Sequence, residues 1–317
     1  KKEVPVARAF VCPGQGAQSI GMGKALAEIY PEAKAVFQEV DDALGEPLSE
    51  LIWGGDLETL TLTENAQPAL MATSLAAFRA LESEGISLQP GDFVAGHSLG
   101  EYSALALSGA LSVADTACLL KARGKAMQAA VPVGVGAMAA LLGLDFEVAS
   151  EVAAEAAEAE VCQAANDNDP GQVVVSGNTD AVERAVEIAK SKGAKRAIIL
   201  PVSAPFHCAL MAPAAEVMKE ALAHVSIRAP KVPLVANVCA EAVSDPEAIR
   251  KLLIEQRTAS VRWRESVLWM SGEGISEIWE IGAGKALSGM VRRINRDITC
   301  RNVAQPEDIS TIIQSLL

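Results

Sequence analysis

The hydroxyl most suited to chemistry in this sequence belongs to Ser98, in the segment Gly96-His97-Ser98-Leu99-Gly100. The apolar run at 93–95 predicts a short buried strand before it, and apolar and small residues at helical spacing over 99–110 predict a helix directly after it. Glycines at both ends of such a sharp turn avoid backbone collisions and leave the central serine exposed above the sheet. This G-x-S-x-G arrangement is typical of a nucleophile, and a serine in an ordinary strand–helix turn is the alternative.

A serine attacks well only when a base accepts its proton, and the chain has three histidines. His97 adjoins Ser98 in the turn, where its side chain is expected to point away from the hydroxyl. His224 follows an amphipathic segment and precedes polar residues, as an exposed residue would. His207 lies where a small predicted domain returns to a larger one. Elimination therefore indicates His207 as the base, with a structural core histidine as the alternative.

A carboxylate usually orients the imidazole in such a site. Glu216 is the nearest carboxylate to His207 in its sequence neighbourhood, and 110 residues follow this histidine. Enzymes of the α/β-hydrolase type place the histidine close to the C-terminus instead. We therefore expect a backbone or side-chain carbonyl to orient His207.

Arg123 is predicted to lie on the apolar face of a helix over 112–130. The positions within about 60° of it, at roughly 100° per residue, are Leu119, Leu120, Ala126 and Met127. An unpaired charge buried there is costly, so either an internal carboxylate or a ligand must pair with it. Because this helix follows the one that begins after Ser98, we favour a ligand carboxylate, which a guanidinium binds through two parallel hydrogen bonds.

The composition excludes several classes of protein. A length of 317 residues with 50% hydrophobic and 4% aromatic residues predicts a large aliphatic core. The net charge of −13 argues against nucleic acid as a general partner. Six cysteines without a C-x-x-C pair indicate free, buried thiols in a reducing cytoplasm, with no metal site. The uncharged run at 126–144 contains glycines and a proline that exclude a membrane span.

The chain predicts an α/β fold. Strands are expected at 8–12, 234–238 and 278–281, and helices from near Ser19 and at 32–44, 68–84, 112–130 and 246–256. Their alternation favours a parallel sheet with helices on both faces. Between residues 134 and 205 the order βαββαβ predicts a small ferredoxin-like domain inserted into the larger one. The larger domain then comprises 1–133 and 206–317, with a ligand cleft between the two.

The sequence resembles the malonyl-CoA:acyl carrier protein transacylase family over nearly its whole length. The resemblance rests on several segments: Pro13-Gly14-Gln15-Gly16-Ala17-Gln18, Gly96-His97-Ser98-Leu99-Gly100-Glu101-Tyr102-Ser103-Ala104, Lys121-Ala122-Arg123-Gly124, Asn166-x-Asn168-x-Pro170-Gly171-Gln172, Ala204-Pro205-Phe206-His207-Cys208, Glu255-Gln256 and Glu280-Ile281-Gly282. It implies a hydrolase-like core, the inserted small domain and no cofactor. The implied substrates are malonyl-CoA and the holo-acyl carrier protein.

The resemblance also implies site roles. Ser98 is the expected nucleophile, His207 the base, and the main-chain carbonyl of Gln256 the group that orients the imidazole. The N–H groups of Gln15 and Leu99 are the expected oxyanion hole. Arg123 is expected to hold the malonyl carboxylate. Asn166 and Asn168 are expected to be structural, as parts of a turn before Gln172.

Two positions depart from the family pattern, in which many bacterial members have serine where Phe206 and Ala17 stand. Ala17 is expected to be neutral, whereas Phe206 beside the base is expected to narrow the acyl pocket against branched groups.

An acidic carrier protein would need a local basic patch on this acidic chain. The candidates are Lys192, Lys195 and Arg196, or Arg292, Arg293 and Arg296.

Two other functions remain as alternatives at this stage. A serine esterase or thioesterase would release malonate to water and have little use for Arg123. A non-catalytic module that binds carrier proteins would have no use for the glycine-framed Ser98. The standalone chain favours fatty acid synthesis over polyketide synthesis.

Overall fold

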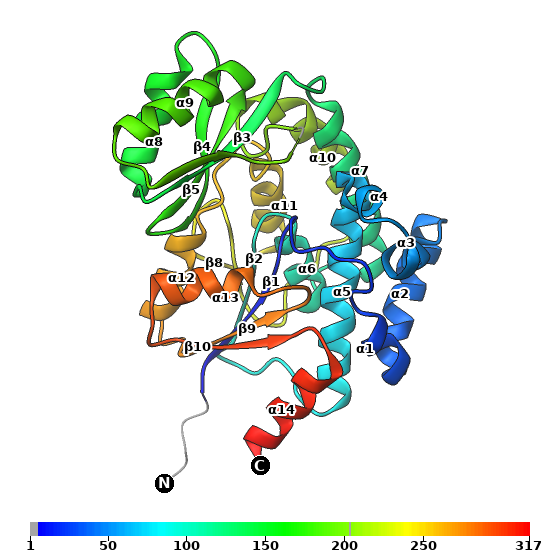
Figure 1. Cartoon of the computed structure of the whole chain (residues 1–317). Helices are drawn as coiled ribbons and strands as arrows, with labels where there is room; N and C mark the ends of the chain where they lie inside the picture. The colour runs from blue at the N-terminus through cyan, green and yellow to red at the C-terminus, as the bar shows by residue number, and fades with distance from the viewer. Residues whose placement is uncertain (1–5, 203) are drawn as a thin grey trace.

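The computed structural model describes residues 6–202 and 204–317, and it contains two separate β-sheets (Figure 1). The larger sheet has the strand order β10-β9-β1-β2-β7-β8. Its strands are β1 (Arg8–Cys12), β2 (Phe93–Gly96), β7 (Leu234–Val235), β8 (Ala242–Val243), β9 (Glu277–Ile281) and β10 (Thr299–Val303). All its pairs are parallel except β7 with β8.

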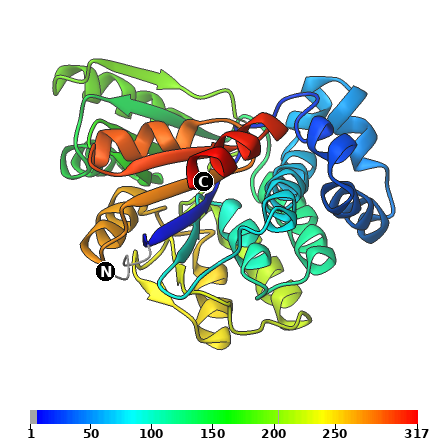
Figure 2. The ribbon, with the colours of Figure 1, turned by 90° about the horizontal axis from the view of Figure 1, so that it is seen from below.

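Helices cover both faces of this sheet because alternate residues of each strand point to opposite sides. Phe10 of β1 packs into one hydrophobic cluster, and Ala9 and Val11 pack into another on the opposite face. The helices of the larger part are α1 (Lys24–Ile29), α2 (Pro31–Leu44), α3 (Leu48–Gly54), α4 (Leu57–Thr61), α5 (Thr63–Ser83), α6 (Gly100–Leu107), α7 (Val113–Ala129), α10 (Ala212–Ala223), α11 (Pro246–Glu255), α12 (Trp263–Gly272), α13 (Ala286–Ile294) and α14 (Pro306–Leu316). Figure 2 shows the blue and cyan helices grouped on one side.

The smaller sheet is antiparallel, with the strand order β4-β5-β3-β6. Its elements are β3 (Gly136–Leu142), α8 (Phe146–Ala157), β4 (Cys162–Asp169), β5 (Gln172–Asn178), α9 (Thr179–Ser191) and β6 (Arg196–Ile199). The apolar faces of α8 and α9 pack on one face of this sheet and enclose a core of alanines, valines and leucines.

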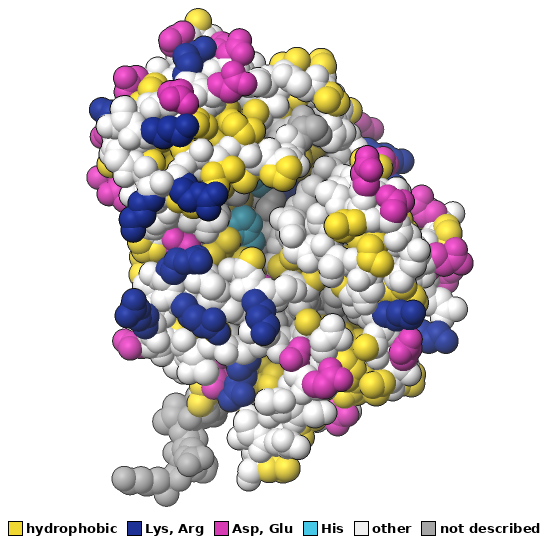
Figure 3. All heavy atoms as spheres, in the orientation of Figure 1, with side chains coloured by type: hydrophobic (Ala, Val, Ile, Leu, Met, Phe, Trp, Pro, Cys, Tyr) yellow, Lys and Arg dark blue, Asp and Glu magenta, His cyan; other side chains and the backbone are white. Residues whose placement is uncertain are grey.

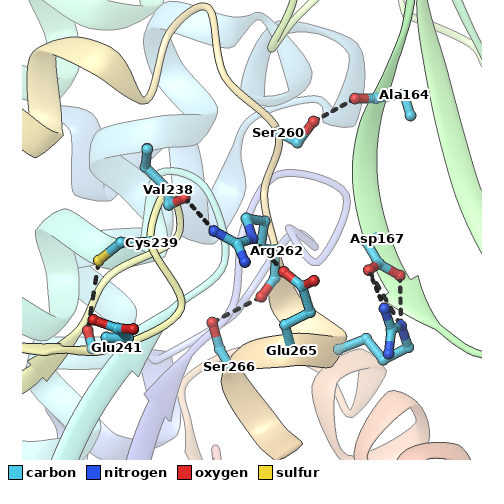
Figure 4. A network of polar contacts seen from close by, with 10 residues as sticks. Ala164, Asp167, Val238, Cys239, Glu241, Ser260, Arg262, Glu265 and Ser266 are labelled. Atoms are coloured by element: carbon cyan, nitrogen blue, oxygen red, sulfur yellow. Dashed lines mark hydrogen bonds and ion pairs between the residues drawn. The ribbon is translucent and has the colours of Figure 1, made fainter. Parts of the chain in front are cut away.

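Strand β4 also joins the smaller sheet to the larger part. Ser260 donates to the carbonyl of Ala164 (Figure 4), and Asn166 pairs with Val261 in an isolated parallel bridge. Register shifts in β4 leave three consecutive side chains buried instead of alternating. Among these, Asp167 accepts from Arg264 at 2.9 Å, and Asp169 accepts from Arg293 of α13 at 2.9 Å.

The structure confirms the predicted α/β class and a sheet rich in parallel pairs, but it corrects several details. The helix expected near Ser19 begins only at Lys24, because Gly21 and Gly23 have left-handed φ values of 92° and 77°. The strand expected at 234–238 ends at Val235.

The cysteines are free, as expected, but Cys118 is exposed and only Cys12, Cys162 and Cys208 are buried. Within the described residues, none of the helices has the length and apolar character needed to cross a membrane. Positions 1–5 and 203, which fall within the expected domains, lie outside the described residues.

The close packing at Gly100 leads to a first prediction. A Cβ at this position would lie 2.2 Å from the carbonyl oxygen of Cys12, a backbone atom of β1 that cannot move aside. We expect Gly100→Ala to lower the free energy of unfolding by about 3 kcal/mol, measured by urea denaturation. Gly289→Ala on α13 is the matched control, because nothing lies within 4 Å of that Cβ. The control should be neutral or stabilising, and equal losses in the two variants would contradict the packing argument.

Candidate active site

Ser98 occupies the turn between β2 and α6 with a left-handed φ of 56°. Only a short connection is available here, and a Cβ at Gly96 would lie 1.9 Å from the backbone of Gly100. The two glycines therefore allow β2 and α6 to approach so closely that Ser98 must take the strained conformation. The turn places its hydroxyl at the carboxyl edge of the sheet, as the sequence predicted.

His207 lies against this hydroxyl although 109 positions separate the two residues. Its Nε2 is 2.7 Å from Ser98 Oγ, and its Nδ1 is 2.8 Å from the backbone carbonyl oxygen of Gln256. The carbonyl can only accept, so Nδ1 carries the proton and Nε2 is free to accept one. Burial, reinforced by the charge of Arg123, lowers the pKa of His207 to about 3. The imidazole is therefore neutral at physiological pH.

Arg123 of α7 is 1% exposed and reaches the same hydroxyl. Its Nη2 lies 3.2 Å from Ser98 Oγ and 2.9 Å from Gln256 Oε1, and its Nη1 lies 2.8 Å from Gln67 Oε1. Within the described residues no carboxylate forms an ion pair with it, and its Nε lacks a partner. In the described part of the chain, internal carboxylates therefore act on this buried charge only from beyond 4.0 Å, without a direct ion pair.

A second buried arginine adds to the positive charge of the site. Arg257 donates to the hydroxyl of Tyr102, and the guanidinium groups of Arg257 and Arg123 lie 5.5 and 5.7 Å from the centre of the Tyr102 ring. The fully buried Glu101 faces both charges, but its burial raises its pKa to about 7. Because that carboxylate is only partly ionised near neutral pH, the site carries an excess of positive charge and favours an anionic ligand.

Gln15 and Leu99 lie on two loops that leave the sheet side by side. Cys12 of β1 pairs with Gly96 of β2 in parallel register, so the loops after these strands emerge at the same edge. A Cβ at Gly14 would lie 2.6 Å from the carbonyl oxygen of His97, which shows how closely the loops approach. The backbone N–H groups of Gln15 and Leu99 make no hydrogen bond within residues 6–202 and 204–317.

The other candidates lie around this centre. Phe206 is 9% exposed and packs with Met127 and Met211 beside the base. The Nε2 of His97 lies 2.7 Å from Asn168 Oδ1, so the His97 side chain is engaged away from the nucleophile. His224 is exposed, as expected.

The two basic clusters lie on different parts of the molecule. Lys192, Lys195 and Arg196 are exposed beside the smaller sheet, whereas Arg292, Arg293 and Arg296 line a surface pocket with Ile298 at the end of α13. Figure 3 shows dark blue side chains beside a hollow that exposes histidine atoms.

Several residues of the site escaped the sequence analysis. Asn237, in the loop after β7, accepts from the backbone N–H of Ser98 at 2.9 Å, and Gln67 contacts Arg123. The side chain of Gln256 donates to the carbonyl of Ser98 at 2.8 Å. Glu101 could have been found by the reasoning applied to Arg123, since it is the charged residue in an otherwise apolar helix. Asn237 has no comparable signal.

Comparisons with known proteins identify the family of the chain. The family model described as acyl transferase domain matches residues 9–281. The chain is 49% identical to the malonyl CoA-acyl carrier protein transacylase of Bacillus subtilis, covering 97% of this chain and 96% of that protein. It is 43% identical to the protein of the same name from Escherichia coli, with 96% and 98% coverage.

Solved structures give the same result. The acyl-carrier-protein-S-malonyltransferase of Bartonella henselae superposes with a TM-score of 0.95 at 55% identity, covering 98% of this chain and 99% of that one. A malonyl-transacylase in complex with a type II PKS acyl-carrier protein superposes with a TM-score of 0.94 at 40% identity, with 98% and 99% coverage. The chain is therefore an acyltransferase and belongs to the malonyl CoA-acyl carrier protein transacylase family.

Proposed function

We propose that the protein transfers a malonyl group from malonyl-CoA to the phosphopantetheine thiol of an acyl carrier protein, through a malonyl ester on Ser98. One observation carries the proposal: Ser98 Oγ lies 2.7 Å from the neutral imidazole of His207 and 3.2 Å from the guanidinium of Arg123. The first contact supplies a base, and the second places a cation where the far end of a malonyl group would lie. The names of the relatives support the same reaction.

In the first half-reaction, Ser98 Oγ attacks the thioester carbonyl and its proton moves to His207 Nε2. The Nδ1–H of His207 stays hydrogen-bonded to the Gln256 carbonyl, which holds the ring in place and stabilises the imidazolium. The free N–H groups of Gln15 and Leu99 stabilise the oxyanion, each contributing roughly 3 kcal/mol. The C–S bond then breaks, and coenzyme A leaves as the thiol with the proton from His207.

The second half-reaction reverses these steps with the carrier thiol as the attacking group. His207 takes the thiol proton, the thiolate attacks the ester carbonyl, and Ser98 leaves with the returned proton. No electrons are gained or lost, so no cofactor is required. This order of events gives ping-pong kinetics.

Arg123 and Phe206 together are proposed to select the acyl group. The malonyl carboxylate would supply the counter-charge that Arg123 lacks inside the protein, so an acetyl group would bind at a disadvantage. Phe206 precedes the base and is buried at the same centre, and its ring is proposed to exclude a branch on the acyl chain.

We propose two domains, a discontinuous hydrolase-like core at 1–133 and 206–317 and a ferredoxin-like insertion at 134–205. The two separate sheets and their strand orders support this division.

The unpaired cysteines favour a reducing, cytoplasmic location, which fractionation of the source cells would test.

The carrier protein is proposed to dock through basic side chains beside the hollow. Lys192, Lys195 and Arg196 lie in β6 and the loop before it, whereas Arg292 and Arg296 lie at the end of α13, so the two clusters are alternative docking surfaces for an acidic partner. Arg293 is already paired with Asp169, which leaves Arg292 and Arg296 as the freer charges of their cluster.

The acyl-enzyme provides a direct test of the proposed reaction. After incubation with malonyl-CoA, the intact protein should gain the mass of one malonyl group, and Ser98→Ala should gain none. Ser103→Ala in α6, the helix that follows Ser98, is the matched control, because its buried hydroxyl lacks a partner within the described residues. An adduct on Ser98→Ala would contradict the assignment. Rapid release of malonate without transfer to carrier protein would favour a thioesterase instead.

Acyl selectivity should depend on Arg123. We expect Arg123→Ala to lower kcat/KM for malonyl-CoA about 100-fold through loss of a charge-assisted pair and to change acetyl transfer far less. Arg123→Lys keeps the charge but not the two-pronged geometry and should show the same ranking. Equal losses for both acyl groups would argue against carboxylate recognition.

In the same assay the wild-type protein should use methylmalonyl-CoA poorly, and turnover comparable to malonyl-CoA would refute the role of Phe206.

Charge reversal should identify the docking cluster. The pairs Lys195→Glu with Arg196→Glu, and Arg292→Glu with Arg296→Glu, are compared for their KM toward carrier protein at low and high salt. The pair that docks the carrier should raise this KM several-fold at low salt and lose most of that effect at high salt. Loading of Ser98 from malonyl-CoA serves as the internal control for folding. If neither pair changes the KM, docking uses another surface.

A further inference from the structure

Asn237 is fully buried in the loop that follows β7, and nearly all its polar atoms are engaged. Its Oδ1 accepts from the backbone N–H of Ser98 at 2.9 Å, and its Nδ2 donates to the carbonyl oxygen of Gly96 at 2.6 Å. The side-chain amide thus binds a donor and an acceptor of the turn that carries the nucleophile. This pair of contacts fixes which end of the amide faces which backbone group.

These two contacts span the strained part of the turn. Ser98 holds a left-handed φ of 56°, a conformation that a residue with a Cβ rarely adopts and that persists only where the surroundings enforce it. The glycines make the turn sterically possible, but they do not select this conformation. The amide of Asn237 does, because rotation of the Ser98 peptide would break its hydrogen bond to Oδ1.

The same oxygen reaches a second part of the site. Gln256 Nε2 lies 3.2 Å from Asn237 Oδ1 and 2.8 Å from the carbonyl of Ser98, while Gln256 Oε1 accepts from Arg123. The backbone of Asn237 is held in turn by Glu101 Oε2 at 2.7 Å and by the N–H of Arg262 at 3.0 Å. Asn237 therefore joins the nucleophile turn to the residue that orients His207.

We propose that Asn237 is a positioning residue for the transfer reaction, which holds Ser98 Oγ in line with His207 and fixes the side chain of Gln256. It touches no reacting atom. The inference rests on the proposed role of Ser98 as the nucleophile, and it goes beyond that role by identifying what enforces the geometry.

Labelling of Ser98 with phenylmethanesulfonyl fluoride tests the positioning role of Asn237 separately from the malonyl transfer reaction. Ser98 Oγ forms a bond to sulfur, the S–F bond breaks, and His207 takes the hydroxyl proton. The labelled fraction reports how much protein is folded, and the rate constant reports positioning. We expect Asn237→Ala to lower the rate constant about 100-fold, and to lower kcat with little change in KM for malonyl-CoA.

Asn178→Ala is the matched control, because Asn178 Oδ1 caps the N–H of Val161 at 2.8 Å in the smaller sheet, apart from the site. It should lower stability but leave the labelling rate constant within about twofold of wild type. A normal rate constant in folded Asn237→Ala, with only a smaller labelled fraction, would reduce Asn237 to a structural residue and overturn the proposal.

Asn237→Asp keeps the acceptor for Ser98 and remains informative if the alanine variant does not fold. An ionised carboxylate would face the Gly96 carbonyl with no proton to donate, whereas a neutral carboxyl would restore the donor. Glu101 binds the backbone N–H of the same residue, so Glu101 and the new carboxyl titrate as a coupled pair, and protonation of either relieves their mutual repulsion. The charges of Arg123 and Arg257 face wild type and variant alike. The ratio of variant to wild-type rate constants should therefore rise as the pH falls from about 8 to about 5.

A ratio that stays flat with pH would contradict the inference. Failure of the wild-type protein to be labelled at Ser98 would instead refute the nucleophile assignment. The two failures are thus distinguishable.

Discussion

The contact between the hydroxyl of Ser98 and the imidazole of His207 depends on strained backbone at both residues. Their φ values are 56° and 57°, and they are two of the four residues other than glycine with left-handed φ in the described chain. A third, Ala240, belongs to the loop of Asn237. Strain of this kind persists only where surrounding contacts enforce it, and here buried side-chain amides, backbone carbonyls and the carboxylate that holds Asn237 do so.

The buried charges of the site make it favour an anionic ligand. Two guanidinium groups lie buried against one tyrosine ring, and Glu101, whose carboxylate faces them, has a raised pKa. Burying charge without compensation costs stability, and this is the basis for the proposal that an acidic acyl group binds there. Burial, with the charge of Arg123 as the second cause, lowers the pKa of His207 and keeps the base neutral. Arg123 thus contributes to the neutrality of the base as well as to the proposed recognition of the substrate.

The sequence predicted those features whose signal is local. Strand, glycine turn and helix around Ser98 follow from short-range patterns, and the burial of Arg123 follows from helical periodicity. The Gln256 carbonyl was accessible only through the family resemblance, because a backbone oxygen has no side-chain signature. Asn237 and Gln67 could not be identified, since their roles depend on contacts across the fold. The late start of α1 was not predicted, because the left-handed glycines before it interrupt a pattern that otherwise favours a helix. The register shifts of β4 were not predicted either, because they depend on how β4 pairs with β5.

The contacts between β4 and the larger part oppose any separation of the two parts of the molecule. The bridge from Asn166 to Val261 and the arginine pairs at Asp167 and Asp169 hold β4 against the larger part. Swinging the two parts open would break all of these at once. Separation of the two parts is therefore a costly route to Ser98, and under the proposed reaction the donor and the acceptor would each reach the hydroxyl with the two parts still joined.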